Sequence, residues 1–205
     1  LAAECRRITL HNLTDRSRTL DLTSCLEVLL NDPRRHADHP GFSKLFIQTE
    51  FLPDREILLA RRRPRGADER HPWLVHAARG DGLLSHETDR GRFLGRGRGP
   101  DAPIALVSLA PLSGMTGDVL DPVLALRRIV ELPPGATARL YLVLAAAQGR
   151  EEGLSIAERL ADAGMFEISY DRSVALATRR LTDHGLSAQG GERLERLAAA
   201  MLYGD

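Results

Sequence analysis

Short runs in which hydrophobic and polar residues alternate fill most of the first 150 positions, and such runs are typical of β-strands with one buried face. Ile8 and Leu10 alternate with polar residues, and Leu20 and Leu22 do so farther along. Loops rich in Pro, Gly, Asp and Arg, such as residues 31–40, separate the runs. This pattern favours a β-sandwich. Further strands are predicted over residues 45–51, 56–61, 73–77, 83–87, 104–109, 124–130 and 138–146.

The first two runs are joined by a polar turn over residues 12–17, which predicts a β-hairpin. In the register that puts the apolar residues on one face, Leu10 lies opposite Leu20. The same register places Cys5 opposite Cys25 on the other face, where we expect two reduced neighbours. The sequence Leu-Pro-Pro-Gly-Ala, ending at Ala136, predicts a turn between two of the last strands.

The pattern changes after Gln148 to apolar residues spaced three and four apart, which is typical of amphipathic helices. Helices are predicted over residues 150–163 and 165–183, with Gly185 as a stop signal, and a third begins near residue 191. The sequence therefore predicts a mainly β fold with an α-helical C-terminal part. Two domains are predicted, a β-sandwich over residues 1–148 and a helical linker over residues 149–205.

Composition excludes several classes of function. Lys+Arg and Asp+Glu each number 28, so the chain has no net charge to attract nucleic acid or anionic lipid. The basic run at residues 61–65 is therefore interpreted as a solvated loop, and no nucleic-acid partner is expected.

His36, Asp38 and His39 lie close in sequence, but a metal site needs converging ligands, so we expect no metal and no cofactor. No apolar run is long enough to span a membrane, and the absence of an initiator Met leads us to expect an upstream segment.

The most distinctive stretch is the arginine–glycine segment, residues 87–100, with the sequence ETDRGRFLGRGRGP. A dinucleotide fingerprint must open a helix, which we expect the prolines at 100 and 103 to prevent, and no Gly-Lys-Ser/Thr of a P-loop follows. One interpretation is a loop whose arginines, among them Arg90, Arg92 and Arg96, hold a sugar or an inorganic anion. The alternative is a surface loop held by ion pairs to Glu87 and Asp89.

Two sugar-related alternatives remain open from the residues alone. A free-standing carbohydrate-binding module usually presents aromatic platforms, yet aromatic residues make up 4% of this chain, and the neighbours of Trp73 point to core packing. A mutarotase-like epimerase needs a His paired with a Glu, which His76 or His86 with Glu87 would supply. A hydrolase needs two suitably placed carboxylic acids, and no second catalytic element is visible.

Four segments, in this order, resemble one family: the phosphorylase-type module of cyclic β-1,2-glucan synthases, related to cellobiose and chitobiose phosphorylases. The likeness runs from about Arg6 to Asp205. The segments are RITLHN (7–12) with LDLTS (20–24), HPGFSKLF (39–46), ETDRGRFLGRG (87–97), and PLSGMTG (111–117) followed by LDP (120–122).

The resemblance implies a galactose-mutarotase-like β-sandwich, here incomplete, followed by linker helices that lead to an (α/α)6 barrel missing from this chain. In the family the barrel carries the catalytic aspartate, and phosphate attacks the anomeric carbon with inversion. No residue of this chain matches that aspartate. The arginine–glycine segment lies toward the barrel in the family, so the resemblance makes Arg90, Arg92 and Arg96 candidate substrate-binding residues.

The function predicted from this resemblance is that of a non-catalytic, carbohydrate-associated fragment of a cyclic β-1,2-glucan synthase. The parent is expected to be a glycosyltransferase and inverting β-glucoside phosphorylase, held at the cytoplasmic side of the inner membrane. The expected partners are a β-linked glucan or oligosaccharide and the missing barrel. A truncated sandwich leaves strand edges unpaired, so self-association as a homodimer is also expected. The alternatives are a free-standing carbohydrate-binding module, a mutarotase-like epimerase and a pure interaction domain.

Overall fold

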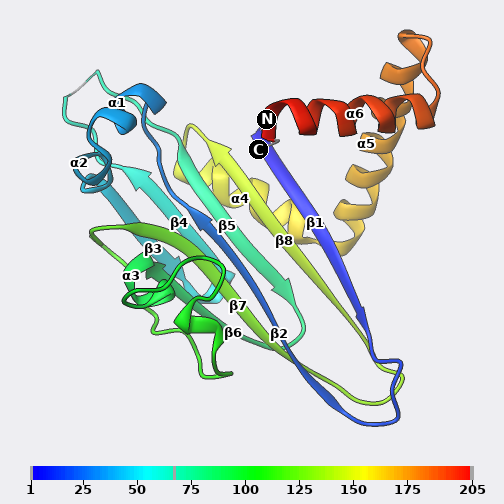
Figure 1. The fold of residues 1–205 in the computed structure, drawn as a ribbon, viewed down its shortest axis with the longest axis horizontal. Coiled ribbons are helices and arrows are strands. Elements are labelled where there is room, and N and C mark those ends of the chain that lie inside the picture. The colour runs from blue at the N-terminus through cyan, green and yellow to red at the C-terminus, as the bar shows by residue number, and fades with distance from the viewer. Residues whose placement is uncertain (1, 67, 204–205) are drawn as a thin grey trace. The chain divides into compact units, whose positions relative to one another are not determined.

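The computed structural model describes residues 2–66 and 68–203 (Figure 1). The chain divides into two compact units, residues 1–161 and 162–205. The first unit contains all eight strands of the described residues, and the second contains two helices. The structure therefore has the mainly β architecture with C-terminal helices that the hydrophobic pattern predicts.

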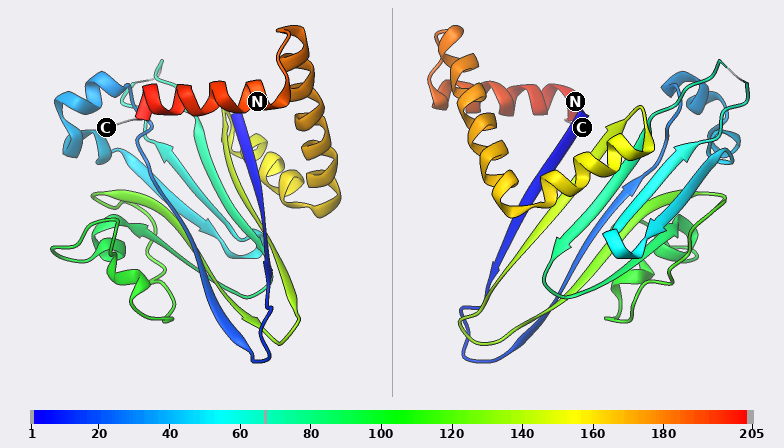
Figure 2. Two further views of the ribbon diagram at one scale, coloured as in Figure 1. Left: turned by 45° about the vertical axis from the view of Figure 1, so that its right-hand side comes forward. Right: turned by 180° about the vertical axis from the view of Figure 1, so that it is seen from behind.

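Two antiparallel sheets form the sandwich of the first unit, and Figure 2 shows them from two sides. Between them lies an apolar cluster that includes Leu58, Ala60 and Ala78 of the larger sheet and Leu124 and Leu126 of the smaller sheet. The larger sheet has the order β1 (Ala2–His11), β8 (Thr137–Ala147), β5 (Trp73–Gly80), β4 (Ile57–Arg62), β3 (Ile47–Leu52). The smaller sheet has the order β2 (Arg18–Glu27), β7 (Pro122–Leu132), β6 (Leu83–Asp89).

The predicted hairpin between the first two strands is wrong, because β1 and β2 belong to different sheets. Cys5 lies opposite Val143 of β8, and Cys25 lies opposite Ala125 of β7. The two cysteines are free thiols and do not face each other. The alternation along each strand is as predicted, but the partner strands come from far along the chain.

The loop between β1 and β2 is fixed by the buried side chain of Asn12. Its amide nitrogen donates to the carbonyl oxygens of Arg16 and Leu132, each at 2.8 Å. The backbone N–H of Asn12 donates to the carbonyl of Ala136, and Gly135 donates back to Asn12. These bonds tie the crossover to the predicted turn between β7 and β8, so both loops turn together at one end of the sandwich.

Two local expectations are corrected. The predicted strand over 104–109 is a 3₁₀ helix, η2 (Ile104–Leu106), followed by irregular chain. Its apolar side chains are largely exposed, and no strand of the described residues pairs with it. The predicted loop over 31–40 contains one short helix, α1 (Pro33–Asp38), and a second, α2 (Pro40–Lys44), begins at its last residue. Asp32 caps α1 by accepting from the backbone N–H of Arg34 at 2.9 Å.

Helix α4 (Arg150–Ala161) packs on the outer face of the larger sheet, against β8 and β5. Leu154 and Ala157 of the helix are fully buried against Val75 and Val143. The approach is close at Gly153, where an added Cβ would lie 2.7 Å from Cγ2 of Val75. The helix thus seals this face with apolar side chains.

The second unit consists of α5 (Ala163–Asp183) and α6 (Ala188–Tyr203). Asp162 caps α5 by accepting from the backbone N–H of Met165 at 2.9 Å. After α5 the chain turns at Gly185, whose φ of 66° favours glycine. Within residues 2–66 and 68–203, no helix combines the length and the apolar character needed to cross a membrane.

Candidate functional site

The outer face of the smaller sheet is covered by residues 90–121, called the cover loop below. It starts where β6 ends at Asp89, whose carboxylate accepts from the backbone N–H groups of Gly91 and Arg92 at 2.8 and 3.2 Å. This cap opens the one-turn helix α3 (Arg90–Leu94). The sequence predicts a loop over this stretch, and α3 corrects that expectation at residues 90–94, because both prolines lie beyond the turn that Asp89 caps. The helix that a dinucleotide fingerprint would open after the glycines does not form, since residues 95–103 contain no α-helix.

An apolar contact anchors the start of the cover loop. Phe93 and Leu94 of α3 are buried against Val123 and Ala125 of β7. Gly95, with φ 84°, then turns the chain where any Cβ would lie 2.8 Å from Cγ2 of Ile104. The glycine is therefore needed for the close packing of η2 beside α3.

A buried arginine holds the middle of the cover loop. Arg127 projects from the outer face of β7 with 1% of its surface exposed. Its guanidinium donates to the carbonyl oxygens of Ala105 and Ala110 at 2.9 and 2.8 Å and to that of Ser108. It also forms an ion pair with Asp21 of β2. Sequence analysis missed this residue, although an arginine pair inside an otherwise apolar strand is a signal of buried charge.

A buried carboxylate holds the end of the cover loop. Oε1 of Glu87 accepts from the backbone N–H groups of Thr88 and Asp89 at 2.9 and 2.8 Å, and Oε2 accepts from the Ser113 hydroxyl. In addition, Gly114 donates its backbone N–H to the carbonyl of His86 at 2.9 Å. Of the ion pairs that the alternative interpretation of this loop expects, those to Glu87 are absent from the described residues, because this carboxylate bonds to other partners. A contact with Asp89 is present at 3.9 Å, from Arg92.

The three candidate arginines differ in how many hydrogen bonds and ion pairs their side chains already form within the protein. Arg90 bonds Oε1 of Glu27 at 2.6 Å and lies 3.6 Å from Oδ2 of Asp121, and the hydrogen bond to Glu27 raises its pKa. Arg92 is exposed, and within the described residues its side chain makes only a long contact of 3.9 Å with Asp89. Arg96 is exposed and has no hydrogen-bond or ion-pair partner within the described part of the chain.

Arg92 also lines a cavity of about 290 Å³ beneath the cover loop, together with Glu87, Ser113 and Arg127. The arrangement offers hydrogen-bond donors at the rim and one fully engaged carboxylate on the floor. Such a site is suited to binding hydroxyl groups or an anion.

The structure does not assemble the His–Glu pair of an epimerase. His86 and Glu87 follow each other on β6, so their side chains point to opposite faces of the smaller sheet. His86 stacks on Phe51 with ring centroids 3.8 Å apart. His76 lies on the inner face of the larger sheet. Within residues 2–66 and 68–203, no group of three or more His, Cys, Asp or Glu side chains is placed to hold a metal ion.

Comparison with known proteins identifies the fold. The family model of the glycosyl hydrolase 94 supersandwich domain matches residues 1–163. The chain belongs to this family. The predicted resemblance to the phosphorylase-type module is thereby confirmed.

A curated relative of this supersandwich is the cyclic beta-(1,2)-glucan synthase NdvB of Rhizobium meliloti (strain 1021). It is 35% identical over 153 residues, which are 73% of this chain and 5% of the relative. The chain therefore spans only a small part of the length of that relative. In this glycosyl hydrolase 94 supersandwich, the cover loop presents Arg92 and Arg96 to solvent, while the half-buried Arg90 is held by ion pairs with Glu27 and Asp121.

Proposed function

We propose that this supersandwich is a non-catalytic, carbohydrate-associated part of a protein that resembles cyclic β-1,2-glucan synthases. In this proposal the catalytic acid belongs to a separate (α/α)6 barrel, and the supersandwich supports that barrel and contacts the glucan through Arg92 and Arg96. The parent would act as a glycosyltransferase and an inverting β-glucoside phosphorylase at the cytoplasmic side of the inner membrane.

The observation that carries the proposal is the division of labour on the cover loop. The carboxylates of Glu87 and Asp89 accept bonds from backbone N–H groups, and that of Glu27 pairs with Arg90. A general acid needs a carboxyl group with a free proton to donate, and these carboxylates are committed to holding the loop. The guanidiniums of Arg92 and Arg96, in contrast, face solvent.

Guanidinium groups suit the proposed ligand. An arginine presents several N–H donors in a rigid plane and binds adjacent oxygen atoms in pairs, whether these are sugar hydroxyls or phosphate oxygens. Because the cover loop is held at Arg127 and Glu87, the backbone that carries its exposed arginines is ordered before a ligand binds, which lowers part of the entropy cost of binding. The loop thus supports a contact to the substrate rather than chemistry on it.

The test is a titration of the folded chain with β-1,2-linked gluco-oligosaccharides, with and without phosphate, followed by NMR. We expect saturable shifts confined to residues 90–98 and about tenfold weaker binding in Arg92→Ala and Arg96→Ala, a loss of about 1.4 kcal/mol. Arg16→Ala is the matched control, since Arg16 is also exposed and its side chain has no partner among the described residues. Unchanged affinity in both loop variants would contradict the proposed glucan contact.

A further inference from the structure

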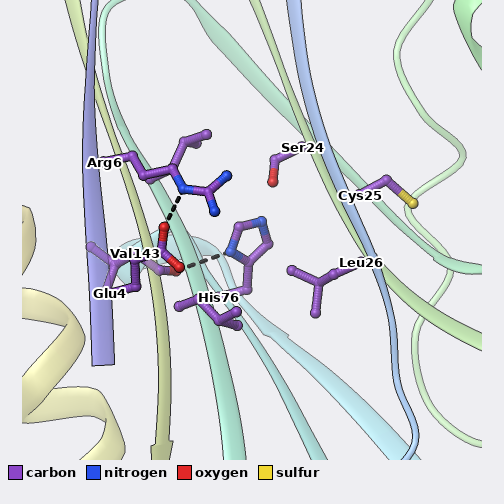
Figure 3. Close-up of a pocket in the computed structure, with 9 residues that line it drawn as sticks. Glu4, Arg6, Ser24, Cys25, Leu26, His76 and Val143 are labelled. Atoms are coloured by element: carbon purple, nitrogen blue, oxygen red, sulfur yellow. Dashed lines mark hydrogen bonds and ion pairs between the residues drawn. The ribbon is translucent and has the colours of Figure 1, made fainter. Parts of the chain in front are cut away.

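A second cavity lies between the two sheets, where the edge strands β1 and β2 diverge (Figure 3). Its volume is about 170 Å³. The walls come from inward-facing residues of both sheets, among them Leu26 of β2 and Leu142 of β8. This cavity is separate from the cover loop, which lies on the outer face of the smaller sheet.

His76 of β5 brings an unsatisfied nitrogen to this cavity. The side chain is 2% exposed, and its Nδ1 lies 3.0 Å from the carbonyl oxygen of Val143. A carbonyl oxygen only accepts, so Nδ1 carries the hydrogen. Burial lowers the pKa of His76, which keeps the ring neutral near pH 7.

In the neutral ring, Nε2 is therefore a hydrogen-bond acceptor. This nitrogen is directed toward the side of the cavity where Ser24 lies (Figure 3). Nε2 is buried and has no hydrogen-bond partner among the described residues. A buried polar atom without a partner destabilises the fold unless something in the cavity satisfies it. The group that His76 requires is a hydroxyl or another neutral donor.

Three further polar side chains line the same cavity. Ser24 of β2 contributes a half-buried hydroxyl whose oxygen has no recorded partner within the described residues. Glu4 and Arg6 of β1 form an ion pair at the rim. Together with Nε2 of His76, these groups supply both donors and acceptors around apolar walls.

The combination selects a neutral, hydroxylated molecule over an ion. An anion would face the lone pair of His76 and the Glu4 carboxylate, and Arg6 is already paired with Glu4. A cavity of about 150 Å³ holds one benzene ring, so this cavity has the size of a single six-membered ring. Apolar walls with a few polar groups are also the usual lining of small-molecule pockets, and the C–H faces of a pyranose offer apolar surface for such walls.

We propose that this cavity is a binding site for one hexopyranose ring, with a ring hydroxyl donating to Nε2 of His76 and another bonding the Ser24 hydroxyl. The ring is either a free monosaccharide or the terminal residue of a glucan chain. The site is independent of the arginines of the cover loop.

The test uses the folded chain with ring-labelled histidine and follows the ¹⁵N shift of His76 Nε2 during titration with D-glucose and with the β-1,2-linked glucose disaccharide. We expect a saturable shift toward the hydrogen-bonded position. Saturation by glucose identifies the monosaccharide as the ligand, whereas saturation by the disaccharide alone identifies a chain end, and either result supports the site. No saturable shift with either sugar would mean that the cavity holds only water and would overturn the proposal.

Variants separate binding from folding. Ser24→Ala keeps His76 in place and is expected to weaken the sugar affinity about tenfold, while His76→Phe is expected to abolish binding. Thr23→Ala is the matched control, because Thr23 precedes Ser24 on β2 and its side chain points to the opposite face. Equal weakening by Thr23→Ala, or a response to inorganic phosphate in place of sugar, would overturn the proposal.

Arg92→Ala and Arg96→Ala are expected to leave the His76 shift unchanged, so failure of this proposal is distinguishable from failure of the proposed glucan contact at the cover loop.

Discussion

The two outer faces of the sandwich are covered in opposite ways. On the larger sheet, α4 places Leu154 and Ala157 on Val75 and Val143 in an apolar contact, with the ion pair of Arg150 and Glu50 at its edge. On the smaller sheet, the cover loop has only a small apolar anchor around Phe93 and is otherwise held by hydrogen bonds and one buried ion pair. One face is therefore covered mainly through burial of apolar surface, and the other mainly through hydrogen bonds and an ion pair.

This difference indicates which outer face of the sandwich can present side chains to a ligand. Apolar burial is non-directional, and a helix that contributes it gains most when its side chains are fully enclosed. A loop held through its carbonyl oxygens by Arg127 leaves its own side chains free to face solvent. The face with the polar cover is thus the one able to present Arg92 and Arg96, while the face with the apolar cover is structural.

The largest effect is expected from weakening the apolar cover with Leu154→Ala. Leu154 is 1% exposed, so its truncation removes buried area and leaves a cavity, and we expect a loss of about 3 kcal/mol in the free energy of unfolding. Chemical denaturation measures it. Leu13→Ala is the control, because Leu13 is 86% exposed and its loss should matter little. A change below about 1 kcal/mol at Leu154 would show that α4 is not a true part of the sandwich.

A smaller effect on overall stability, with a local signature, is expected from Arg127→Met. The substitution keeps the aliphatic length but frees three carbonyl oxygens and leaves Asp21 without its partner. Because Asp21 retains some exposure to solvent, we expect a loss of about 2 kcal/mol, less than for a fully buried pair.

Hydrogen exchange distinguishes this local effect from a global one. Residues 104–110 should lose protection in Arg127→Met while the amides of β8 keep theirs, relative to the global change in stability. Arg139→Met is the matched control, since Arg139 is an exposed arginine on β8, a strand of the other sheet. Uniform loss of protection across both sheets would contradict the idea that Arg127 acts on the cover loop.

The contrast between the two covers also explains what the sequence could predict. Alternation along β2 or β8 depends on the residues of that strand alone, so most strands were located to within a few residues. Strand pairing was not predictable in the same way, because Cys5 meets Val143 across more than half the chain and nothing local encodes that partner. Helix α4 was found for the same local reason as the strands.

The candidate site was predicted in part. The glycines and arginines of residues 87–100 marked the loop, and the capping role of Asp89 is visible once α3 is known. The roles of Arg127 and Glu87 depend on which face of a strand each occupies, which requires the sheet register. The free nitrogen of His76 depends on a cavity between two sheets, and no sequence pattern signals it.

The smallest expected effect is a difference in alkylation rate between two cysteines, one beside each cover. Cys5 lies under α4, where its thiol donates to the carbonyl of Leu160 at 3.2 Å, and Cys25 lies beside the cover loop near Arg90. Burial raises the pKa of both thiols to about 11, with Glu4 contributing at Cys5 and Glu27 at Cys25. At pH 8 both are therefore largely protonated, and alkylation should speed up about tenfold per pH unit as the thiolate fraction grows.

Since the two pKa values are alike, access decides which thiol reacts first. Cys25 keeps an exposed surface, although neighbouring protein groups desolvate its thiol enough to raise the pKa, whereas Cys5 is less exposed. We therefore expect Cys25 to be alkylated faster by iodoacetamide, as measured by mass spectrometry of the two peptides. Glu27→Gln removes the negative charge beside Cys25 and frees Arg90, so it should lower the pKa of Cys25 and raise its rate severalfold at pH 8. Cys5 in the same molecule is the internal control. Faster reaction at Cys5 would mean that α4 opens more readily than the cover loop, and the apolar cover would then be the weaker of the two.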